Sequence, residues 1–286
     1  MKRSFRAASL SVLLLLAPGT RGWSDPQSEP FSFGVISHRS PTLTAQFWNP
    51  ILSYVSERSG VPLHLKVART GPEHTDMVGR GELDFLYSNH NFIKEHEAIG
   101  YRVFARPKED PGKGQIVVLE NSTIRSLDDL QGKEMTFPHT AAFLGYHLPM
   151  DALLRKGIHV KPLFAGNQEG AMGQLKAGRT IAAGVNAEVM RAFAQREHVA
   201  YRVLWSSEAY LSLALSAHPS VPAKKVSAVR EAFLQVADDP EGVKVLEASA
   251  AVLKETALLR FIAAKDADFD NMRRFYRTTL VKVELH

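Results

Sequence analysis

The sequence contains no cysteine among its 286 residues. Disulfide bonds, thiolate metal sites and a cysteine nucleophile are therefore excluded, and so is the lipid-modified cysteine that anchors some exported proteins to a membrane. Long apolar runs are missing too, because the longest, residues 7–17, is about half of the roughly twenty residues that span a bilayer as a helix. We therefore expect a soluble protein that meets a membrane only through a partner.

The signatures of common catalytic and metal sites are absent as well. The sequence has no nucleophile elbow of the form GxSxG, no phosphate-binding P-loop and no dinucleotide-binding fingerprint. Its 11 histidines form no HExxH motif and no pair at i, i+4 with a third ligand in a recognised pattern. We therefore predict a protein that is not an enzyme and that uses no metal or other cofactor.

The N-terminus has the pattern of a secretory signal peptide. Lys2, Arg3 and Arg6 precede the apolar run, and small residues follow it. We expect residues 1–23 to be removed on export. This segment carries four basic residues and no acid, so its removal would lower the net charge from +5 to +1.

No strongly basic surface is expected on the mature chain. The nearest candidates are Arg273, Arg274 and Arg277, which lie at helical spacing near the C-terminus. A nucleic-acid surface needs more clustered basic residues than these, and such spacing is typical of the solvated face of a helix. We therefore predict no nucleic-acid partner.

The first part of the mature chain alternates predicted strands with predicted helices. Ser40 followed by Pro41 is a helix start, because the serine can cap the first turn and proline needs no hydrogen-bond partner there. Gly60 marks the end of that helix. The predicted elements are strand 31–36, helix 41–59, strand 63–68, helix 76–81 and strand 83–87.

This alternation predicts a largely parallel sheet with helices on its faces. Ligands of such sheets collect at the carboxyl ends of the strands. The loops 37–40, 69–73 and 88–91 should therefore surround one crevice.

A second α/β unit follows, and the chain then returns to the first. The predicted elements of the second unit are strands 115–119, 134–137, 160–164 and 180–185 and helices 126–130, 140–156 and 170–177, with Pro149 bending or interrupting the second helix. The segment 210–216 leads back to three closing helices, 226–237, 240–253 and 268–276. We predict lobe 1 from residues 24–113 and 207–286 and lobe 2 from 114–206, joined by two crossing connections that act as hinges.

Segments spread over nearly the whole mature chain resemble one known family, the phosphate, phosphite and phosphonate solute-binding proteins of bacterial ABC transporters. These PhnD-like proteins have the type 2 periplasmic-binding-protein fold, which is α/β with a ligand cleft between two lobes. The matching segments include FGVISHRSP, GRGELDFLYSN, STIRSLDDLQGK, residues 138–157, AGNQEGAMGQLKAG and DDPEGVKVLEA.

The resemblance implies a monomeric periplasmic protein whose lobes close on a small anionic ligand, which is then delivered to a membrane permease. One alternative is a periplasmic ligand-sensing partner of a two-component sensor kinase, because divergent members with a similar turn after the second strand of lobe 2 resemble sensing modules. A third possibility is an enzyme that uses this fold on a small anion, although no catalytic motif supports it.

Two of the departures from the family pattern bear most directly on the ligand. Phosphonate binders carry a Ser-Thr-Ser-Gly turn at the start of a lobe 2 helix, where this chain has residues 138–142, of which only Thr140 has a hydroxyl group. Aminoalkyl-phosphonate binders place an acid where this chain has Asn167 and Gln168. An aminophosphonate is therefore not the expected ligand.

Thr140, together with the backbone amides of Ala141 and Ala142, is the predicted main anchor, because a helix start holds an oxyanion without a formal cation. Protonated His139 could donate to an anion, and Arg39 could form a bidentate pair. Most of these residues also fit a plain role as a helix cap or surface side chain, and Tyr87 and Phe143 could wall the pocket or belong to the core. The predicted ligand-binding residues are Arg39, Ser40, Ser88, Asn89, His139, Thr140, Ala141, Asn167, Gln168 and Asn186.

Overall fold

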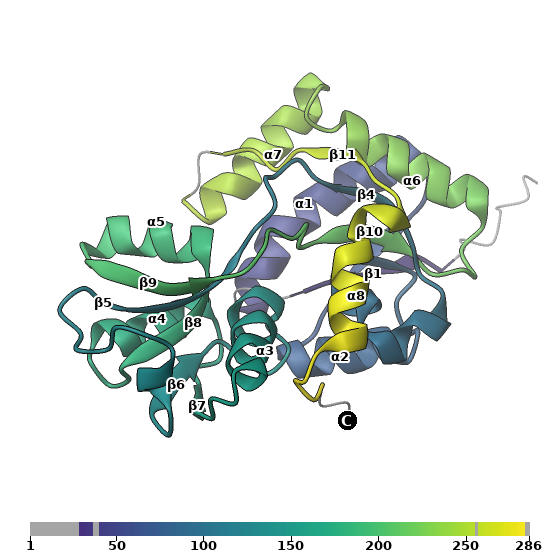
Figure 1. Cartoon of the computed structure of the whole chain (residues 1–286). Helices are drawn as coiled ribbons and strands as arrows, with labels where there is room; N and C mark the ends of the chain where they lie inside the picture. Colours follow the sequence, from purple (N-terminus) through teal and green to yellow (C-terminus); the bar gives the residue numbers. More distant parts are fainter. Residues whose placement is uncertain (1–28, 37–39, 255–256, 284–286) are drawn as a thin grey trace, which may run out of the picture.

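The computed structural model describes residues 29–36, 40–254 and 257–283. Two β-sheets, each flanked by helices, form two lobes (Figure 1). Below, the lobe that holds the six-stranded sheet is called lobe 1, and the lobe that holds the five-stranded sheet is called lobe 2. This arrangement is the predicted α/β architecture.

Lobe 1 is built around a mostly buried sheet. β1 lies parallel to β2 and β3, whereas β10 lies antiparallel to β3. Phe33 of β1 is fully buried, with ring centroids 5.8 Å from Trp48 and 5.6 Å from Phe233, so helices on one face are held to the sheet by aromatic packing. In sheet order the strands are β11 (Phe261–Ala263), β4 (Arg102–Pro107), β10 (Ala214–Ala217), β3 (Phe85–Ser88), β1 (Phe31–Val35) and β2 (Leu63–Val67).

The first helix of lobe 1 begins and ends as the sequence predicts. The Oγ of Ser40 accepts a hydrogen bond from the backbone N–H of Leu43 (3.4 Å), and Gly60 has the left-handed conformation with φ of 66°. The helices are α1 (Pro41–Ser59), α2 (Gly71–Gly79), α6 (Ala223–Gln235), α7 (Pro240–Val252) and α8 (Asp270–Thr278), with short turns η1 (His90–Phe92), η2 (Lys94–Ile99) and η5 (Asp266–Phe269).

The second helix, α2, starts five residues earlier than predicted. The Oγ1 of Thr70 accepts from the backbone N–H of Glu73 (3.2 Å), and Pro72 fits the first turn. The segment 69–73 is therefore mainly a helix start and not a loop, and Gly71 lies at the first position of the helix.

Lobe 2 contains a mixed sheet. β6 is parallel to β7 and β8, while β5 is antiparallel to β8 and β9. In sheet order the strands are β7 (Lys161–Phe164), β6 (Glu134–Phe137), β8 (Ala182–Asn186), β5 (Gly114–Leu119) and β9 (Tyr201–Ser206). The helices are α3 (Leu148–Arg155), α4 (Gln168–Lys176) and α5 (Ala187–Glu197), with turns η3 (Asp128–Leu130) and η4 (Phe143–His147).

The predicted helix 140–156 is wrong at its N-terminal end. Ala142 is extended, and the chain then makes a π-helical turn, η4, in which the N–H of His147 donates to the carbonyl of Ala142 (3.0 Å). Pro149 lies in the first turn of α3, directly after the π-helical turn, where a missing N–H is tolerated.

The predicted helix 126–130 shortens to the single turn η3. The carboxylate of Asp129, rather than the hydroxyl of Ser126, closes this turn by accepting from the N–H groups of Arg125 and Ser126 (2.8 and 3.0 Å). A Ser cap is therefore not what starts this turn.

Two crossing segments join the lobes and pair with each other. The N–H of Gly112 donates to the carbonyl of Tyr210, and the N–H of Tyr210 donates to the carbonyl of Gly112, both at 2.8 Å. These segments are the two predicted crossing connections, and their action as hinges stays a prediction.

The C-terminal segment makes a third contact between the lobes (Figure 1, yellow). After α8, the Oγ1 of Thr279 and the N–H of Leu280 both donate to the carboxylate of Asp151 in α3, at 2.9 and 2.8 Å. A buried apolar cluster between the lobes includes Phe143 of lobe 2 and Phe275 of α8, whose ring centroids lie 5.3 Å apart. The lobes are thus packed together on this side of the molecule.

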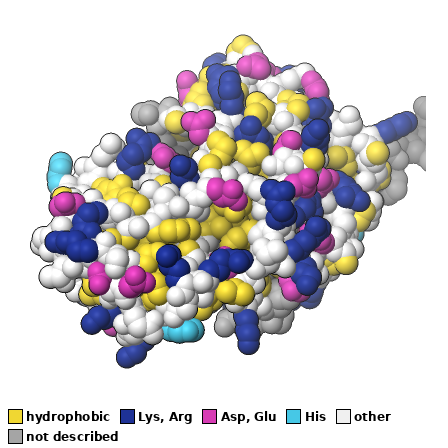
Figure 2. Space-filling view, in the orientation of Figure 1, with side chains coloured by type: hydrophobic (Ala, Val, Ile, Leu, Met, Phe, Trp, Pro, Cys, Tyr) yellow, Lys and Arg dark blue, Asp and Glu magenta, His cyan; other side chains and the backbone are white. Residues whose placement is uncertain are grey.

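Surface charge is mixed in sign. Figure 2 shows basic and acidic side chains interspersed over one face of the molecule. Arg277 forms an ion pair with Glu97 (2.8 Å), and Arg273 pairs with Asp266 (2.6 Å) and is only partly exposed. Arg274 and Arg277 are exposed as predicted, but Arg273 is not fully solvated because it also lies over the Phe92 ring.

Within the described part of the chain, no helix combines the length and the apolar character needed to cross a membrane.

Candidate functional site

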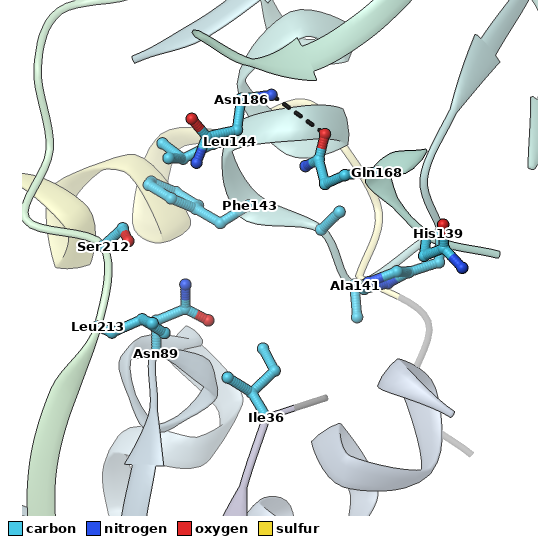
Figure 3. Close-up of a pocket in the computed structure, with 12 residues that line it drawn as sticks. Ile36, Asn89, His139, Ala141, Phe143, Leu144, Gln168, Asn186, Ser212 and Leu213 are labelled. Atoms are coloured by element: carbon cyan, nitrogen blue, oxygen red, sulfur yellow. Dashed lines mark hydrogen bonds between the residues drawn. The ribbon is translucent and has the colours of Figure 1, made fainter. Parts of the chain in front are cut away.

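A cavity of about 60 Å³ lies between the lobes, where the crossing segments meet the ends of the strands (Figure 3). Ile36 and Asn89 of lobe 1 lie on one side, and Gln168 and Asn186 of lobe 2 lie on the opposite side. The full lining is Ile36, Asn89, His139, Ala141, Ala142, Phe143, Leu144, Asn167, Gln168, Asn186, Ser212 and Leu213. The small volume favours a ligand of a few heavy atoms.

The polar wall of lobe 2 consists of three carboxamides, Asn167, Gln168 and Asn186, called the amide wall below. The Oδ1 of Asn167 caps α4 by accepting from the N–H of Gly170 (2.8 Å). The Oδ1 of Asn186 caps α5 by accepting from the N–H of Glu188 (3.0 Å), and the Oε1 of Gln168 accepts from the N–H of Asn186 (3.2 Å). Because a backbone N–H requires an acceptor, these bonds fix which end of each side chain is oxygen.

The amide wall therefore presents hydrogen-bond donors to the cavity. Each side chain has its oxygen engaged by the backbone, so the NH₂ group remains for a ligand. Two helix N-termini, those of α4 and α5, also meet the cavity at their capping residues. The positive ends of helix dipoles favour a negatively charged ligand.

Acids in the first turns of these helices are neutralised locally. Glu169 of α4 pairs with Arg196 (2.7 Å), and Glu188 of α5 pairs with Arg191. These four side chains are more than half exposed, so their ion pairs contribute little to stability. The described lining itself contains no Asp, Glu, Lys or Arg.

Asn89 lies on the opposite wall and is almost completely buried. Its side chain is 5% exposed, and its Oδ1 has no hydrogen-bond partner. A buried carbonyl oxygen without a partner is costly, because it has lost water and gained nothing in return. Asn89 is thus a buried polar residue at the cavity whose side-chain oxygen lacks a hydrogen-bond partner.

His139 lies between the cavity and α2. Its ring packs against Gly71, so closely that a Cβ added to Gly71 would lie 2.6 Å from Cε1 and 2.7 Å from Nδ1. Burial lowers the pKa of His139 to about 4. The ring is therefore uncharged at pH 7 in this structure, and donation from a protonated His139 to a bound anion stays a prediction.

Further buried histidines lie near the boundary between the lobes. His74 and His90 belong to lobe 1 and have ring centroids 5.3 Å apart, while His139 and His147 belong to lobe 2. The Nε2 of His90 lies 3.3 Å from the carbonyl oxygen of Ala141 across the lobe boundary, and Nδ1 of His147 lies 3.2 Å from the hydroxyl of Tyr276. These four residues are called the interlobe histidines below.

Burial keeps two more of the interlobe histidines, His90 and His147, uncharged at pH 7. The pKa of His90 is lowered well below its usual value, first by burial and then by the neighbouring histidines. Burial lowers the pKa of His147 to about 4. The contact between the lobes therefore contains neutral imidazoles at pH 7.

Six of the ten predicted site residues line the cavity, namely Asn89, His139, Ala141, Asn167, Gln168 and Asn186. Ser88 is completely buried and faces His74, with Oγ 3.0 Å from Nε2, so the prediction that it faces the crevice is wrong. Ser40 only caps α1, and Thr140 is not among the lining residues because the helix starts three residues later. Arg39 lies outside the described residues.

Of the two aromatic candidates, Phe143 lines the cavity, whereas Tyr87 is core, with its ring centroid 4.7 Å from that of Trp48. Ala142, predicted to contribute its backbone amide, lines the cavity, whereas the prediction missed the lining residues Ile36, Leu144, Ser212 and Leu213. Ser212 and Leu213 lie in the second crossing segment, so the expected return of the chain at 210–216 was the signal that could have found them.

Among the described residues, no group of three or more His, Asp or Glu side chains is arranged to hold a metal ion. Three of the interlobe histidines, His74, His90 and His147, instead make hydrogen bonds to hydroxyl or carbonyl groups. The chemistry of the cavity is that of hydrogen-bond donors, one unsatisfied oxygen and apolar walls.

Comparison with known proteins gives one family and one fold. A family model described as "ABC transporter, phosphonate, periplasmic substrate-binding protein" matches residues 33–269. No curated protein matches the chain in sequence.

Three solved structures illustrate the shared type 2 periplasmic-binding-protein fold. A binding protein component of an ABC phosphonate transporter from Pseudomonas aeruginosa has a TM-score of 0.68 at 17% identity, over 86% of this chain and 85% of that one. PhnD1 from Prochlorococcus marinus in complex with methylphosphonate has a TM-score of 0.71 at 15% identity, over 86% and 97%. A Xanthomonas citri protein bound to a chloride ion has a TM-score of 0.70 at 16% identity, over 86% and 96%.

Proposed function

Because the chain belongs to the family of periplasmic substrate-binding proteins of ABC phosphonate transporters, we propose that it captures a small phosphonate-like oxyanion and delivers it to a membrane permease. This is a family of transport proteins rather than of enzymes. We further propose that the mature protein begins near Ser24, acts as a monomer, and divides into lobes at residues 113–114 and 206–207.

The observation that carries this proposal is the amide wall at two helix starts. Asn167, Gln168 and Asn186 offer NH₂ donors in fixed positions, and the α4 and α5 dipoles favour negative charge at the same place. An oxyanion can accept from several donors at once, which a neutral apolar ligand cannot do. PhnD1 of Prochlorococcus marinus, which shares the fold, holds methylphosphonate.

Capture would work by closure of the two lobes. A ligand that contacts Asn89 on lobe 1 and the amide wall on lobe 2 binds the closed form more tightly than the open form, and so shifts the population towards closure. The crossing segments at Gly112 and Tyr210 would carry the hinge movement. The closed form is the state that a permease would recognise.

A ligand screen by thermal unfolding tests this function. Phosphite, phosphate, methylphosphonate, sulfate and short carboxylates would each be added to the mature protein. A ligand at about one hundred times its dissociation constant should add about 2.7 kcal/mol to the free energy of unfolding. Stabilisation by carboxylates alone, with none by a phosphorus oxyanion, would contradict the proposal.

A further inference from the structure

The segment that follows α8 leaves lobe 1 and is bound by lobe 2 (Figure 1, yellow). Residues 279–283 are called the C-terminal strap below. Helix α8 itself is held to lobe 1, where Arg277 forms an ion pair with Glu97 (2.8 Å). The side chain of Val281, in contrast, is 6% exposed and belongs to the same buried apolar cluster as Leu153 of α3. The strap therefore continues a helix of one lobe and packs into the core of the other.

Asp151 of α3 is the anchor for the strap. Its side chain is only 8% exposed, and its Oδ1 accepts from both the Oγ1 of Thr279 (2.9 Å) and the N–H of Leu280 (2.8 Å). Arg155, one turn further along α3, pairs with Asp151 and donates from Nη2 to the carbonyl of Thr278 (2.7 Å). Hydrogen bonds to an ionised partner are stronger than those between neutral groups. Two side chains of one helix thus hold three successive residues at the point where α8 ends and the strap begins.

The contacts between the lobes are weaker on the cavity side. The Nε2 of His90 lies 3.3 Å from the carbonyl oxygen of Ala141, which is a long hydrogen bond between neutral groups. The ring of His139 packs against Gly71 of α2, and the cavity itself leaves a gap in the boundary. Such contacts are worth less than charge-assisted hydrogen bonds together with a buried valine. Opening of the cleft should therefore break the contacts on the cavity side and leave those of the strap in place.

The contacts of α8 form a line that runs from the crossing segments to the strap. Near the start of α8, the Nδ2 of Asn271 donates to the carbonyl of Ala209 (3.3 Å), and one turn later the ring centroid of Phe275 lies 6.5 Å from that of Tyr210. The strap begins at Thr279, eight residues after Asn271, which corresponds to about 12 Å of helix. Two bodies that are joined at both ends of a line can turn only about that line.

Building on the lobe closure proposed above, we infer that α8 and the C-terminal strap form a third connection between the lobes, which stays docked when the cleft opens. The lobes then turn about an axis along α8, and the strap limits how far they separate in the ligand-free protein. This limit keeps the ligand-free protein near the closed form, and so raises the fraction of molecules that is competent to bind. The strap acts only on this balance, because none of its residues belongs to the described lining of the cavity.

Distances between two spin labels, measured by pulsed electron paramagnetic resonance, test the inference. The sequence has no cysteine, so Thr42→Cys in α1 and Ala192→Cys in α5 supply one exposed label site on each lobe. Thr279→Val together with Val281→Ser removes the hydroxyl donor and the buried apolar contact of the strap. In the ligand-free protein this double variant should give a broader distance distribution than the wild-type strap. Saturating methylphosphonate should bring both proteins to the same narrow distribution.

Leu280→Ser is the matched control. The side chain of Leu280 is 54% exposed, and the substitution keeps the backbone N–H that donates to Asp151, so the wild-type distribution should remain. Calorimetry should show affinity for methylphosphonate reduced by about threefold or more in the double variant, because more open conformations compete with closure. The control should keep the wild-type affinity. Thr279→Val alone should broaden the distribution less than the double variant does, and it provides the test if the double variant does not fold.

Two results would overturn the inference, once thermal unfolding has identified the variants that are folded. Equal ligand-free distributions in the wild-type strap and in the folded strap variants would mean that the strap does not limit opening. Equal broadening in Leu280→Ser would mean that the effect does not come from the contacts with Asp151 and the core of lobe 2. If methylphosphonate narrows the distribution of none of the proteins, the proposed function fails, whereas the comparison of the ligand-free distributions still decides the role of the strap.

Discussion

Two sets of polar side chains meet at the boundary between the lobes, and they are held in opposite ways. The amide wall is held by its own lobe, because its oxygens accept from the backbone of lobe 2. The interlobe histidines are held partly by the other lobe, as in the bond from His90 to the carbonyl of Ala141. Opening the cleft leaves the first set intact and breaks contacts of the second.

This difference separates a preformed site from a closure contact. Donors whose orientation is fixed before the ligand arrives lose little entropy on binding. Neutral imidazoles buried between the lobes, in contrast, stabilise only the closed form, and only while they stay uncharged. Breaking one set should therefore change affinity for ligand, and breaking the other should change the balance between open and closed forms.

Acidification should have the largest effect, and it should act on the histidines alone. His147 has a pKa near 4 in the folded protein and about 6.5 when unfolded, so its contribution is fully present above pH 6.5 and is lost as the pH falls towards 4. His147 alone should lower the free energy of unfolding by about 2 kcal/mol between pH 7 and pH 5. Urea unfolding over this range measures the effect.

Two variants make the acid experiment specific. His147→Gln removes the titrating ring and should reduce the loss of stability between pH 7 and pH 5. His64→Gln changes a histidine that is exposed on β2 and should leave the loss unchanged. An equal pH dependence in all three proteins would mean that the buried ring does not govern acid sensitivity.

The second prediction places a methyl group in the contact between the lobes. In Gly71→Ala the new Cβ would lie 2.6 Å from the ring of His139, and an overpacked contact typically costs about 1–3 kcal/mol. Because His139 belongs to lobe 2 and α2 to lobe 1, this strain arises only on closure. Calorimetry should show ligand affinity reduced by about tenfold or more.

Gly79→Ala is the control for this contact. Its Cβ would also lie 2.6 Å from a histidine ring, but that ring is His96 and both residues belong to lobe 1. This variant should lower the melting temperature with little change in affinity. If both alanine variants weakened binding equally, the contact of Gly71 with His139 would have no special part in closure.

Much of the fold could be read from local signals. Strand β6 has its predicted bounds, and α1 has its predicted cap and end, because Ser40, Pro41 and Gly60 each act through the chain next to them. The start of α2 was missed although Thr70 and Pro72 carry ordinary helix-start signals. Those residues indicated a helix start at Gly71, but the segment 69–73 was predicted to be a loop.

The site was harder to read, because it depends on how distant segments meet. Asn167 and Asn186 were predicted correctly as cavity residues from their place after strands. Ser88 was misplaced by one step of strand alternation, which sends its hydroxyl to His74. The extended Ala142 and the π-helical turn after it follow from packing between the lobes, which no local pattern of Thr140 and its neighbours indicates.

The third prediction alters the amide wall without disturbing its support. Gln168→Glu keeps an oxygen to accept from the N–H of Asn186 but replaces the donor with a second, charged oxygen. Affinity for methylphosphonate should fall by about tenfold or more, since a carboxylate repels an anion nearby. Affinity for 2-aminoethylphosphonate should fall less, because its ammonium group gains a partner.

Gln174→Glu adds the same charge on the same helix, at a residue that does not line the cavity. Calorimetry with both ligands should give nearly wild-type affinities for this control. An unchanged ratio between the two ligands in Gln168→Glu would show that Gln168 does not face the ligand.

The smallest effect is expected on the far side of the lobe boundary, at α8. Tyr276→Phe removes the hydroxyl that lies 3.2 Å from Nδ1 of His147, at a cost of about 1 kcal/mol in the free energy of unfolding. The aromatic packing of the ring on Phe143 remains, with centroids 5.5 Å apart, so the lobes should stay in contact on this side. Affinity for ligand should change by less than threefold, as measured by calorimetry, because neither His147 nor Tyr276 lines the cavity. A loss of affinity as large as that of Gly71→Ala would mean that the lobes also separate at α8, and that closure involves the whole boundary instead of the cavity side alone.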